Sequence, residues 1–291
     1  PPLTIGAEHN LGTLVRSRMG ARVLDRMVAP LTYGIHGVPP EQVDVDRAAR
    51  GLNAALTRTG SLSGGVAQQL PDPDAERRPS RGTIAGGMSV FIDALAARLS
   101  DLEVDVRTGT EVASLSPTSD GWSVAWSEAG ETGGTDVDAV IVATPERAAR
   151  RLIAAHLDGL DGPVLSPDDV DVVTLVLDAP ALDSRPRGHA VYAVPGAAPA
   201  VAVVHATATW PHAPGDPHIV RVTTPASELS SGDAIAAATA AAAHLLGVDL
   251  GTVRATYRAR WSPALPSSAL SPARDDVRRA ARRDARLGVA G

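Results

Sequence analysis

The stretch Asp138-Ala-Val-Ile-Val-Ala-Thr-Pro145 is an almost continuous apolar run, which is typical of a strand buried on both faces of a sheet. Pro145 ends the run, and residues 146–157 continue with the apolar spacing of a helix. A strand that leads directly into a helix indicates an α/β arrangement. Residues 138–157 are therefore the starting point for predicting the structure of the rest of the chain.

Shorter segments on both sides extend this arrangement. Alternating or apolar runs predict strands at residues 103–107, 112–115, 121–126, 135–138, 170–178, 189–194, 200–207, 218–224 and 253–261. Helical spacing predicts helices at residues 9–29, 46–58, 88–99, 234–246 and 274–286. Gly20 is expected to divide the first helix and Asn10 to cap it. Residues 30–40 are rich in turn formers, and residues 59–82 have the composition of a linker. The fold class that follows is α+β with mixed sheets.

Composition bounds the possible chemistry. The 291 residues correspond to about two domains, and a mean hydropathy of +0.01 is ordinary for a globular chain. The absence of Cys excludes disulfides, thiolate metal sites and Cys nucleophiles. All 27 basic residues are Arg, which excludes a P-loop Lys and Schiff-base chemistry. A net charge of −6 and eight aromatic Phe, Trp and Tyr residues disfavour nucleic acid as a partner.

No segment has the pattern of a membrane span or an export signal. The longest apolar stretch, residues 234–248, is rich in Ala and contains Thr239 and His244. A spanning helix needs about 20 strongly apolar residues, so we expect a packed helix there. The sequence thus predicts a cytoplasmic protein without a spanning segment, and it leaves the oligomeric state open.

Common catalytic and cofactor fingerprints are absent. No G-x-G-x-x-G, P-loop, HExxH or G-x-S-x-G pattern occurs in the chain. His205, His212 and His218 lie within 14 positions, but their spacing matches no metal-ligand pattern, and we expect no metal. Composition and residue spacing alone therefore predict only the fold class, α/β or α+β, and no function.

Several segments, in order, resemble the FAD-dependent protoporphyrinogen/coproporphyrinogen III oxidase family of the amine-oxidase-like superfamily, most closely its actinobacterial type. The segments are residues 11–30, with LGTLVRSRMGARVLDRMVAP, then Thr32-Tyr-Gly-Ile-His-Gly37, residues 86–99, residues 106–112, residues 138–145, Thr209-Trp-Pro-His212 and Arg260-Trp-Ser-Pro-Ala-Leu-Pro266. Together they extend over almost the whole chain.

The resemblance implies an oxygen-dependent flavoenzyme of heme biosynthesis. Such an enzyme holds FAD and oxidises a reduced tetrapyrrole, passing hydride from a bridging carbon to the flavin, which dioxygen reoxidises. The flavin performs the chemistry while the protein positions the ring, and no catalytic side chain is assigned. Coproporphyrinogen III, giving coproporphyrin III, is the expected substrate, and protoporphyrinogen IX, giving protoporphyrin IX, is the near alternative.

The resemblance also implies a domain plan and two cofactor-binding positions. Residues 1–82 correspond to a helical module, residues 83–146 and 261–291 to an incomplete FAD-binding portion, and residues 147–260 to the substrate domain. Val112 matches a position whose main chain meets the adenine of FAD, and Trp261 matches a Trp near the flavin ring. The alternative for each is a core residue on a strand.

The family's glycine-rich flavin segments lie outside residues 1–291 in this comparison. In addition, Ser267-Ser268 stand where the family has Gln-Tyr. The chain is therefore expected to be either an incomplete piece of the oxidase or an inactive remnant. Another flavin amine oxidase or desaturase is the remaining alternative.

Four further features have both a functional and a plain interpretation. Thr144 and Pro145 either border a cofactor or only end a strand. Gly86 and Gly87 either face a phosphate at a helix start or form a turn. Two groups of arginines either bind propionates or form solvated helix faces; they are Arg16, Arg18, Arg22 and Arg26, and Arg274, Arg278, Arg279, Arg282, Arg283 and Arg286.

Overall fold

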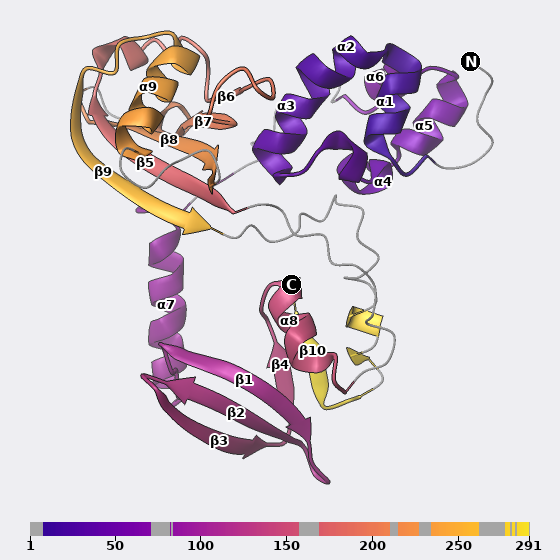
Figure 1. Ribbon diagram of the computed structural model, residues 1–291, viewed down its shortest axis with the longest axis vertical. Coiled ribbons are helices and arrows are strands. Elements are labelled where there is room, and N and C mark those ends of the chain that lie inside the picture. Colours follow the sequence, from indigo (N-terminus) through magenta and orange to yellow (C-terminus); the bar gives the residue numbers. More distant parts are fainter. Residues whose placement is uncertain are drawn as a thin grey trace. The chain divides into compact units, whose positions relative to one another are not determined.

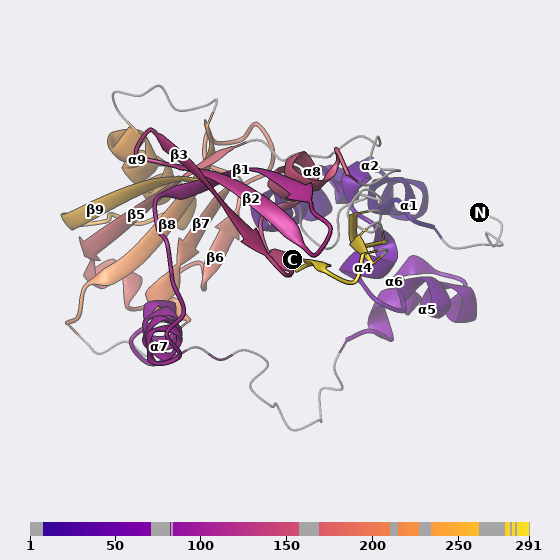
Figure 2. The same cartoon turned by 90° about the horizontal axis from the view of Figure 1, so that it is seen from below.

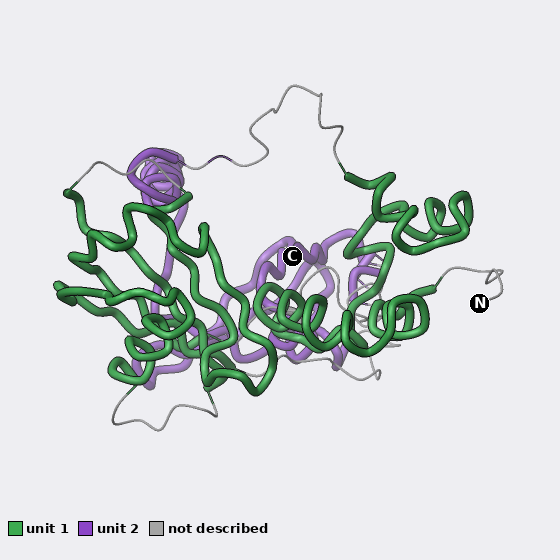
Figure 3. The backbone as a smooth tube through the Cα atoms, turned by 90° about the horizontal axis from the view of Figure 1, so that it is seen from above, with its two compact units in different colours: residues 1–71, 165–270 green, residues 72–164, 271–291 purple. Residues whose placement is uncertain are grey.

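The computed structural model describes residues 8–70, 82, 84–156, 169–209, 215–226, 234–261, 277–279, 281–282 and 284–290. The chain forms two compact units (Figure 3). Unit 1 comprises residues 1–71 and 165–270, and unit 2 comprises residues 72–164 and 271–291. The mixture of helices and several sheets confirms the α+β class. The three-domain division expected from sequence stays a prediction.

Unit 1 begins with a helical module (Figure 1). Helix α1 spans Leu11–Met19, and the side chain of Asn10 accepts a hydrogen bond from Thr13 N, as expected for its cap. Gly20, with φ 88°, separates α1 from the following turns. These are α2 (Ala21–Val23), η1 (Leu24–Val28), α3 (Ala29–Leu31) and η2 (Thr32–His36).

The expected turn-rich segment at residues 30–40 is therefore partly wrong. Helical structure continues through Pro30, because this proline lies in the first turn of α3, where a missing N–H is tolerated. It ends at Gly37, whose φ is 68°. Both η1 and η2 are π-helical turns, which are rare and often found at functional sites.

The remaining helices of the module are short. They are η3 (Pro40–Gln42), α4 (Val45–Ala48), α5 (Leu52–Thr59) and α6 (Leu62–Ala67). Helix α6 corrects the expectation of a linker from residue 59 onward, since Ser61 caps it by accepting from Gly64 N. Residues 71–81 of that expected linker lie outside the described residues. Leu14, Leu24, Val45 and Leu52 form the centre of the module's core.

A five-stranded antiparallel sheet follows in unit 1, with strand order β6-β7-β8-β5-β9 (Figure 2). The strands are β5 (Val170–Asp178), β6 (Ala190–Tyr192), β7 (Ala202–His205), β8 (His218–Pro225) and β9 (Thr252–Trp261). Short turns η4 (Pro180–Leu182) and η5 (Ala206–Ala208) lie between them. All five strands were expected from sequence, within two residues at each end.

Helix α9 (Ala234–Leu246) packs on one face of this sheet. Its Ala238 and Ala242 contact a core that includes Leu175 of β5 and Val220 of β8. Small alanines allow the helix backbone to approach the strands closely. Gly247, with φ 71°, ends the helix where the sequence predicted.

Unit 2 contains the apolar run of residues 138–145. Strand β4 (Val140–Val142) pairs in parallel with β10 (Leu287–Val289), and helix α8 (Glu146–Ile153) follows β4. Strands β1 (Thr110–Pro117), β2 (Trp122–Glu128) and β3 (Glu131–Val137) form an antiparallel sheet. Buried side chains of β1, β2, β4, α8 and β10 share one core.

Three expectations for unit 2 need correction or lie partly outside the described residues. Helix α7 (Met88–Asp101) is confirmed, but residues 103–107 form no strand, since they are exposed and have no ladder partner. Helix α8 ends at Ile153 rather than at residue 157. Of the expected helix at residues 274–286, residues 277–279 and 281 are helical, while residues 274–276, 280 and 283 lie outside the described residues. Within the described part of the chain, no helix is long and apolar enough to cross a membrane.

Candidate functional site

The five-stranded sheet has one covered and one open face. Successive side chains of a strand point to opposite faces, so Val173 and Leu175, which pack under α9, fix the orientation of the others. Val172 and Thr174 point to the opposite face and are only half-buried. We call this opposite side the open face.

Strand register gives the layout of the open face. One row across the sheet runs through Tyr192, Ala202, Thr223, Val172 and Ala259. Its last four members, on β7, β8, β5 and β9, are small side chains; Ala202 is buried, whereas Thr223, Val172 and Ala259 are half-buried. Two strand spacings of about 4.8 Å make the accessible part of the row, from β8 to β9, about 10 Å wide. The row is therefore a broad and shallow floor.

Larger side chains stand around this floor. The neighbouring row runs through Ala190, Val204, Arg221, Thr174 and Tyr257. Trp261 lies at the end of β9, opposite Val170. Tyr257 and Trp261 are 69% and 59% exposed. Two large aromatic side chains left in solvent on one strand are informative, because exposed apolar groups of this size mark binding surfaces.

The charges on the covered face are arranged differently. The Asp171 carboxylate, 1% exposed, accepts hydrogen bonds from Arg258 Nη2 at 2.9 Å and from Arg260 Nη2 at 3.0 Å. These hydrogen bonds lower the pKa of Asp171 from 3.8 to about 2. The covered face thus holds its arginines in an internal ion cluster.

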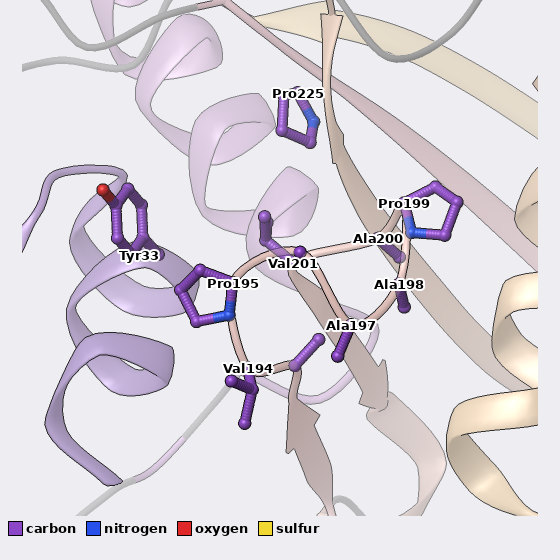
Figure 4. A pocket seen from close by; sticks show the side chains of 11 residues that line it. Tyr33, Val194, Pro195, Ala197, Ala198, Pro199, Ala200, Val201 and Pro225 are labelled. Atoms are coloured by element: carbon purple, nitrogen blue, oxygen red, sulfur yellow. The ribbon is translucent and has the colours of Figure 1, made fainter. Parts of the chain in front are cut away.

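A cavity of about 520 Å³ lies within unit 1 (Figure 4). Tyr33 of η2 stands on one side, and the loop of residues 193–201 together with Pro225 of β8 forms the other. Its other lining residues are Ala, Val, Pro and Gly. Burial, and secondarily the nearby Glu41 carboxylate, raise the pKa of Tyr33, so its hydroxyl stays protonated at neutral pH. Tyr33 contributes its ring to the wall of this largely apolar space, and its hydroxyl points away from the loop of residues 193–201 (Figure 4).

The cavity adjoins the open face through two strands. Pro225 ends β8 two residues after Thr223 of the floor. On β6, Tyr192 lies against Gly34 of η2, where an added Cβ would come within 2.3 Å of the tyrosine ring. Gly34 is thus required for the close approach of the helical module to this edge of the sheet. Floor, rim and cavity together make a site for a flat, largely apolar ligand.

The two cofactor positions expected from sequence fall in different units. Trp261 lies on the rim described above, in unit 1. Val112 lies on β1 in unit 2, half-buried against the core of that unit. The structure places Val112 on β1 and Trp261 on β9.

The surroundings of Val112 have free hydrogen-bonding capacity. A register shift between Val112 and Ser114 marks a β-bulge, a feature that frees main-chain groups and is common next to binding sites. Thr110 Oγ1 and Trp126 Nε1 are buried and have no hydrogen-bond partner among the described residues. Both lie on the same side of the sheet as Val112, since Val112 pairs with Trp126. These groups fit the polar edge of a nucleotide.

For several other residues singled out in the sequence, the structure fits a structural role rather than ligand binding. Arg16 forms an exposed ion pair with Glu41 at 3.0 Å. Gly86 and Gly87 have φ values of 86° and 95°, and Gly87 N bonds to Ile84 O, as in a turn. Thr144 and Pro145 are exposed beyond the end of β4. In the second arginine group, Arg286 Nη1 donates to Ser119 O at 3.4 Å, and Arg274 and Arg283 lie outside the described residues.

Of the three histidines noted in the sequence, His205 and His218 lie in contact. His205 Nε2 lies 3.1 Å from His218 Nδ1, and His218 Nε2 lies 3.2 Å from Asp183 Oδ1. His212 lies outside the described residues. Among the residues that the structure describes, no three His, Asp or Glu side chains are grouped as metal ligands.

The sequence analysis missed most of the site. Tyr33, Tyr192, Arg221 and Tyr257 were not singled out, although each lies on a predicted helix, turn or strand. Their alternation with buried core residues, as in Val220-Arg221-Val222, was the signal that could have placed them on an unburied face.

Comparisons with known proteins identify the family. The family model described as flavin containing amine oxidoreductase matches residues 2–291. A crystal structure from Exiguobacterium sp. 255-15, provisionally assigned as a protoporphyrinogen oxidase, superposes with a TM-score of 0.77 at 17% identity. That match covers 100% of this chain and 63% of the other.

Two further solved structures have the same fold. A reduced UDP-galactopyranose mutase matches with a TM-score of 0.61 at 12% identity, over 97% of this chain and 60% of its own. An oxidoreductase from Methanosarcina mazei matches with a TM-score of 0.58 at 14% identity, over 99% and 63%. The chain therefore spans less than two thirds of the length of these structures, and at such identities they support the fold alone.

Proposed function

The chain belongs to the flavin containing amine oxidoreductase family, and from this premise we propose that it provides the substrate-binding portion of an FAD-dependent porphyrinogen oxidase. The observation that carries the proposal is the open face, a broad floor of small side chains rimmed by Tyr192, Tyr257 and Trp261. A flat macrocycle can cover such a floor and contact aromatic rings at its edges.

The family is flavin-containing, which agrees with the FAD expected from the sequence resemblance. When bound, FAD would supply the redox chemistry, as acceptor of hydride from the reduced macrocycle and donor of electrons to dioxygen. We assign Val112, Thr110 and Trp126 to the adenine end of the cofactor, because Val112 lies beside a β-bulge and the buried Thr110 Oγ1 and Trp126 Nε1 have no hydrogen-bond partner among the described residues. Trp261 is assigned to the flavin ring end, as the resemblance implies.

The chain's own residues bind and orient the substrate. The floor holds the ring plane, Tyr257 and Trp261 limit its sliding toward the edge of β9, and the cavity beside Tyr33 accepts apolar substituents. Among the described residues of this site, none is placed to act as a general acid or base on the ring. In the proposed reaction the cofactor performs the chemistry and the protein supplies position and exclusion of water.

The porphyrin specificity rests on the shape of the floor and on the resemblance in the sequence. Coproporphyrin III remains the expected product, and protoporphyrin IX the alternative. An amine oxidase or a desaturase would instead need a narrow site for an extended substrate, which an open floor about 10 Å wide does not favour.

Matched substitutions on the two faces test the proposal. Thr223→Trp fills the floor, while Thr256→Trp makes the same change on the exposed edge of the covered face. Titration of the chain with coproporphyrin III, followed by the Soret band, should give saturable binding for wild type and T256W and none for T223W. Equal binding by T223W and wild type would contradict the proposed floor, and absence of binding by folded wild type would contradict the proposed function.

A further inference from the structure

Arg221 is an exposed, charged residue on the open face, and its cross-strand neighbours are uncharged. It lies on β8 between Val220 and Val222, both of which are fully buried in the core under α9. Its side chain must therefore point to the opposite face, and it is exposed there. Its neighbours across the strands are Val204 and Thr174, neither of which carries a charge.

The charge of Arg221 is not neutralised by the described part of the chain. No hydrogen bond or ion pair joins Arg221 to any residue that the structure describes. Asp178, the acidic residue on the same face of β5, is already bonded to Arg254 Nε at 2.5 Å. It also lies four residues along β5 from Thr174, about 13 Å away, which exceeds the screening length of about 8 Å at physiological salt.

The arginines on the covered face provide a contrast within the same sheet. Arg258 and Arg260 share the buried carboxylate of Asp171. The guanidinium groups of Arg258 and Arg260 are thus paired with a carboxylate of the chain, whereas the Arg221 guanidinium is exposed on the open face. Guanidinium binds carboxylate in a bidentate manner through two parallel N–H donors.

The distances suit a carboxylate at the periphery of a macrocycle. Arg221 and Tyr257 are separated by two strand spacings, about 10 Å, with Thr174 between them. Along β8, Arg221 and Pro225 at the cavity are four residues, about 13 Å, apart. A ring that covers Thr223 and Val172 would bring one edge substituent to Arg221 and another toward the cavity.

We infer that Arg221 is the residue that recognises a propionate carboxylate of the tetrapyrrole and fixes the rotation of the ring on the open face. This inference rests on the proposed function. The carboxylate accepts two hydrogen bonds from the Arg221 guanidinium, and the apolar substituents of the ring turn toward the Tyr33 cavity. Arg221 is a specificity-determining residue and takes no part in the redox step.

The test compares a charged and an uncharged porphyrin with Arg221 variants. Arg221→Met removes the charge and keeps most of the apolar stem, Arg221→Lys keeps the charge without the fork, and Arg260→Met is the matched control on the covered face. Each is titrated with coproporphyrin III and with its neutral tetraamide, and thermal unfolding of each variant reports folding.

R221M should weaken coproporphyrin III binding about 10- to 100-fold, the usual effect of losing a hydrogen bond to a charged group. R221K should show a smaller loss, R260M none, and the tetraamide should bind wild type and R221M equally. Unchanged coproporphyrin III affinity in folded R221M would overturn the role of Arg221 and leave the proposed function standing. Failure of folded wild type to bind either porphyrin would overturn both.

Discussion

The two faces of the five-stranded sheet in unit 1 are built from the same strands but have different roles. The covered face buries Val173, Leu175 and Val222 under α9 and pairs its charges internally around Asp171. The open face leaves Tyr257, Trp261 and Arg221 in solvent. Successive residues of a strand point to opposite faces, so neighbouring positions have different roles. Substitutions one position apart should therefore affect either stability or ligand binding.

The largest difference is expected from shortening a core side chain. Leu175→Ala removes a side chain that is 0% exposed, and we expect a loss of about 2–5 kcal/mol in the free energy of unfolding. The neighbouring change Thr174→Ala, on the open face, should cost much less. Urea denaturation followed by circular dichroism measures both; equal losses would refute the distinction between the faces.

A smaller effect is expected from the charge cluster on the covered face. The lowered pKa of Asp171 means that its carboxylate stabilises the fold above its usual pKa of 3.8, and that this contribution is lost as the pH falls toward about 2. The shift corresponds to about 2 kcal/mol. Asp171→Asn should therefore be about 2 kcal/mol less stable than wild type at pH 6.

The same variant has a characteristic pH dependence. The stability difference between D171N and wild type should shrink as the pH is lowered from 5 through 3, because wild type loses the contribution that D171N already lacks. Denaturation curves at several pH values measure this difference. A difference that stays constant with pH would show that the Asp171 ion cluster is not its source.

The smallest effect is expected from an exposed aromatic residue. Tyr257→Ala should change the free energy of unfolding by no more than about 0.5 kcal/mol, because the ring is largely in solvent. It should weaken porphyrin binding about two- to tenfold, since an aromatic contact contributes about 0.5–1.5 kcal/mol. Titration and thermal unfolding of the same preparation separate the two effects. A loss of stability with unchanged affinity would reverse the assignment of this face.

Much of the secondary structure could be predicted from the sequence because the local signals agree. Strand β5 alternates strictly between buried and half-buried residues, and α9 ends at a glycine with positive φ. The segment that includes η2 was harder, because Pro30 and the glycines at 34 and 37 are typical of turns, whereas packing carries the helix through to His36.

The site was less predictable than the fold, because it depends on strands that are distant in sequence. Tyr192 and Ala259 share a row only through the order β6-β7-β8-β5-β9, which periodicity within single segments does not contain. Arg221 was hidden for the same reason, since its isolation follows from what lies on the neighbouring strands. Trp261 could be named only because a family resemblance pointed to it.

The central claim is that a tetrapyrrole lies on the open face, and footprinting tests it directly. The chain is exposed to hydroxyl radicals in the dark, with and without saturating coproporphyrin III, and oxidation of each residue is measured by mass spectrometry. The account predicts protection of Tyr257 and Trp261, with unchanged oxidation of Met88 and Phe91, which are exposed on α7 in unit 2. Unchanged oxidation of Tyr257 and Trp261 at saturation would contradict it.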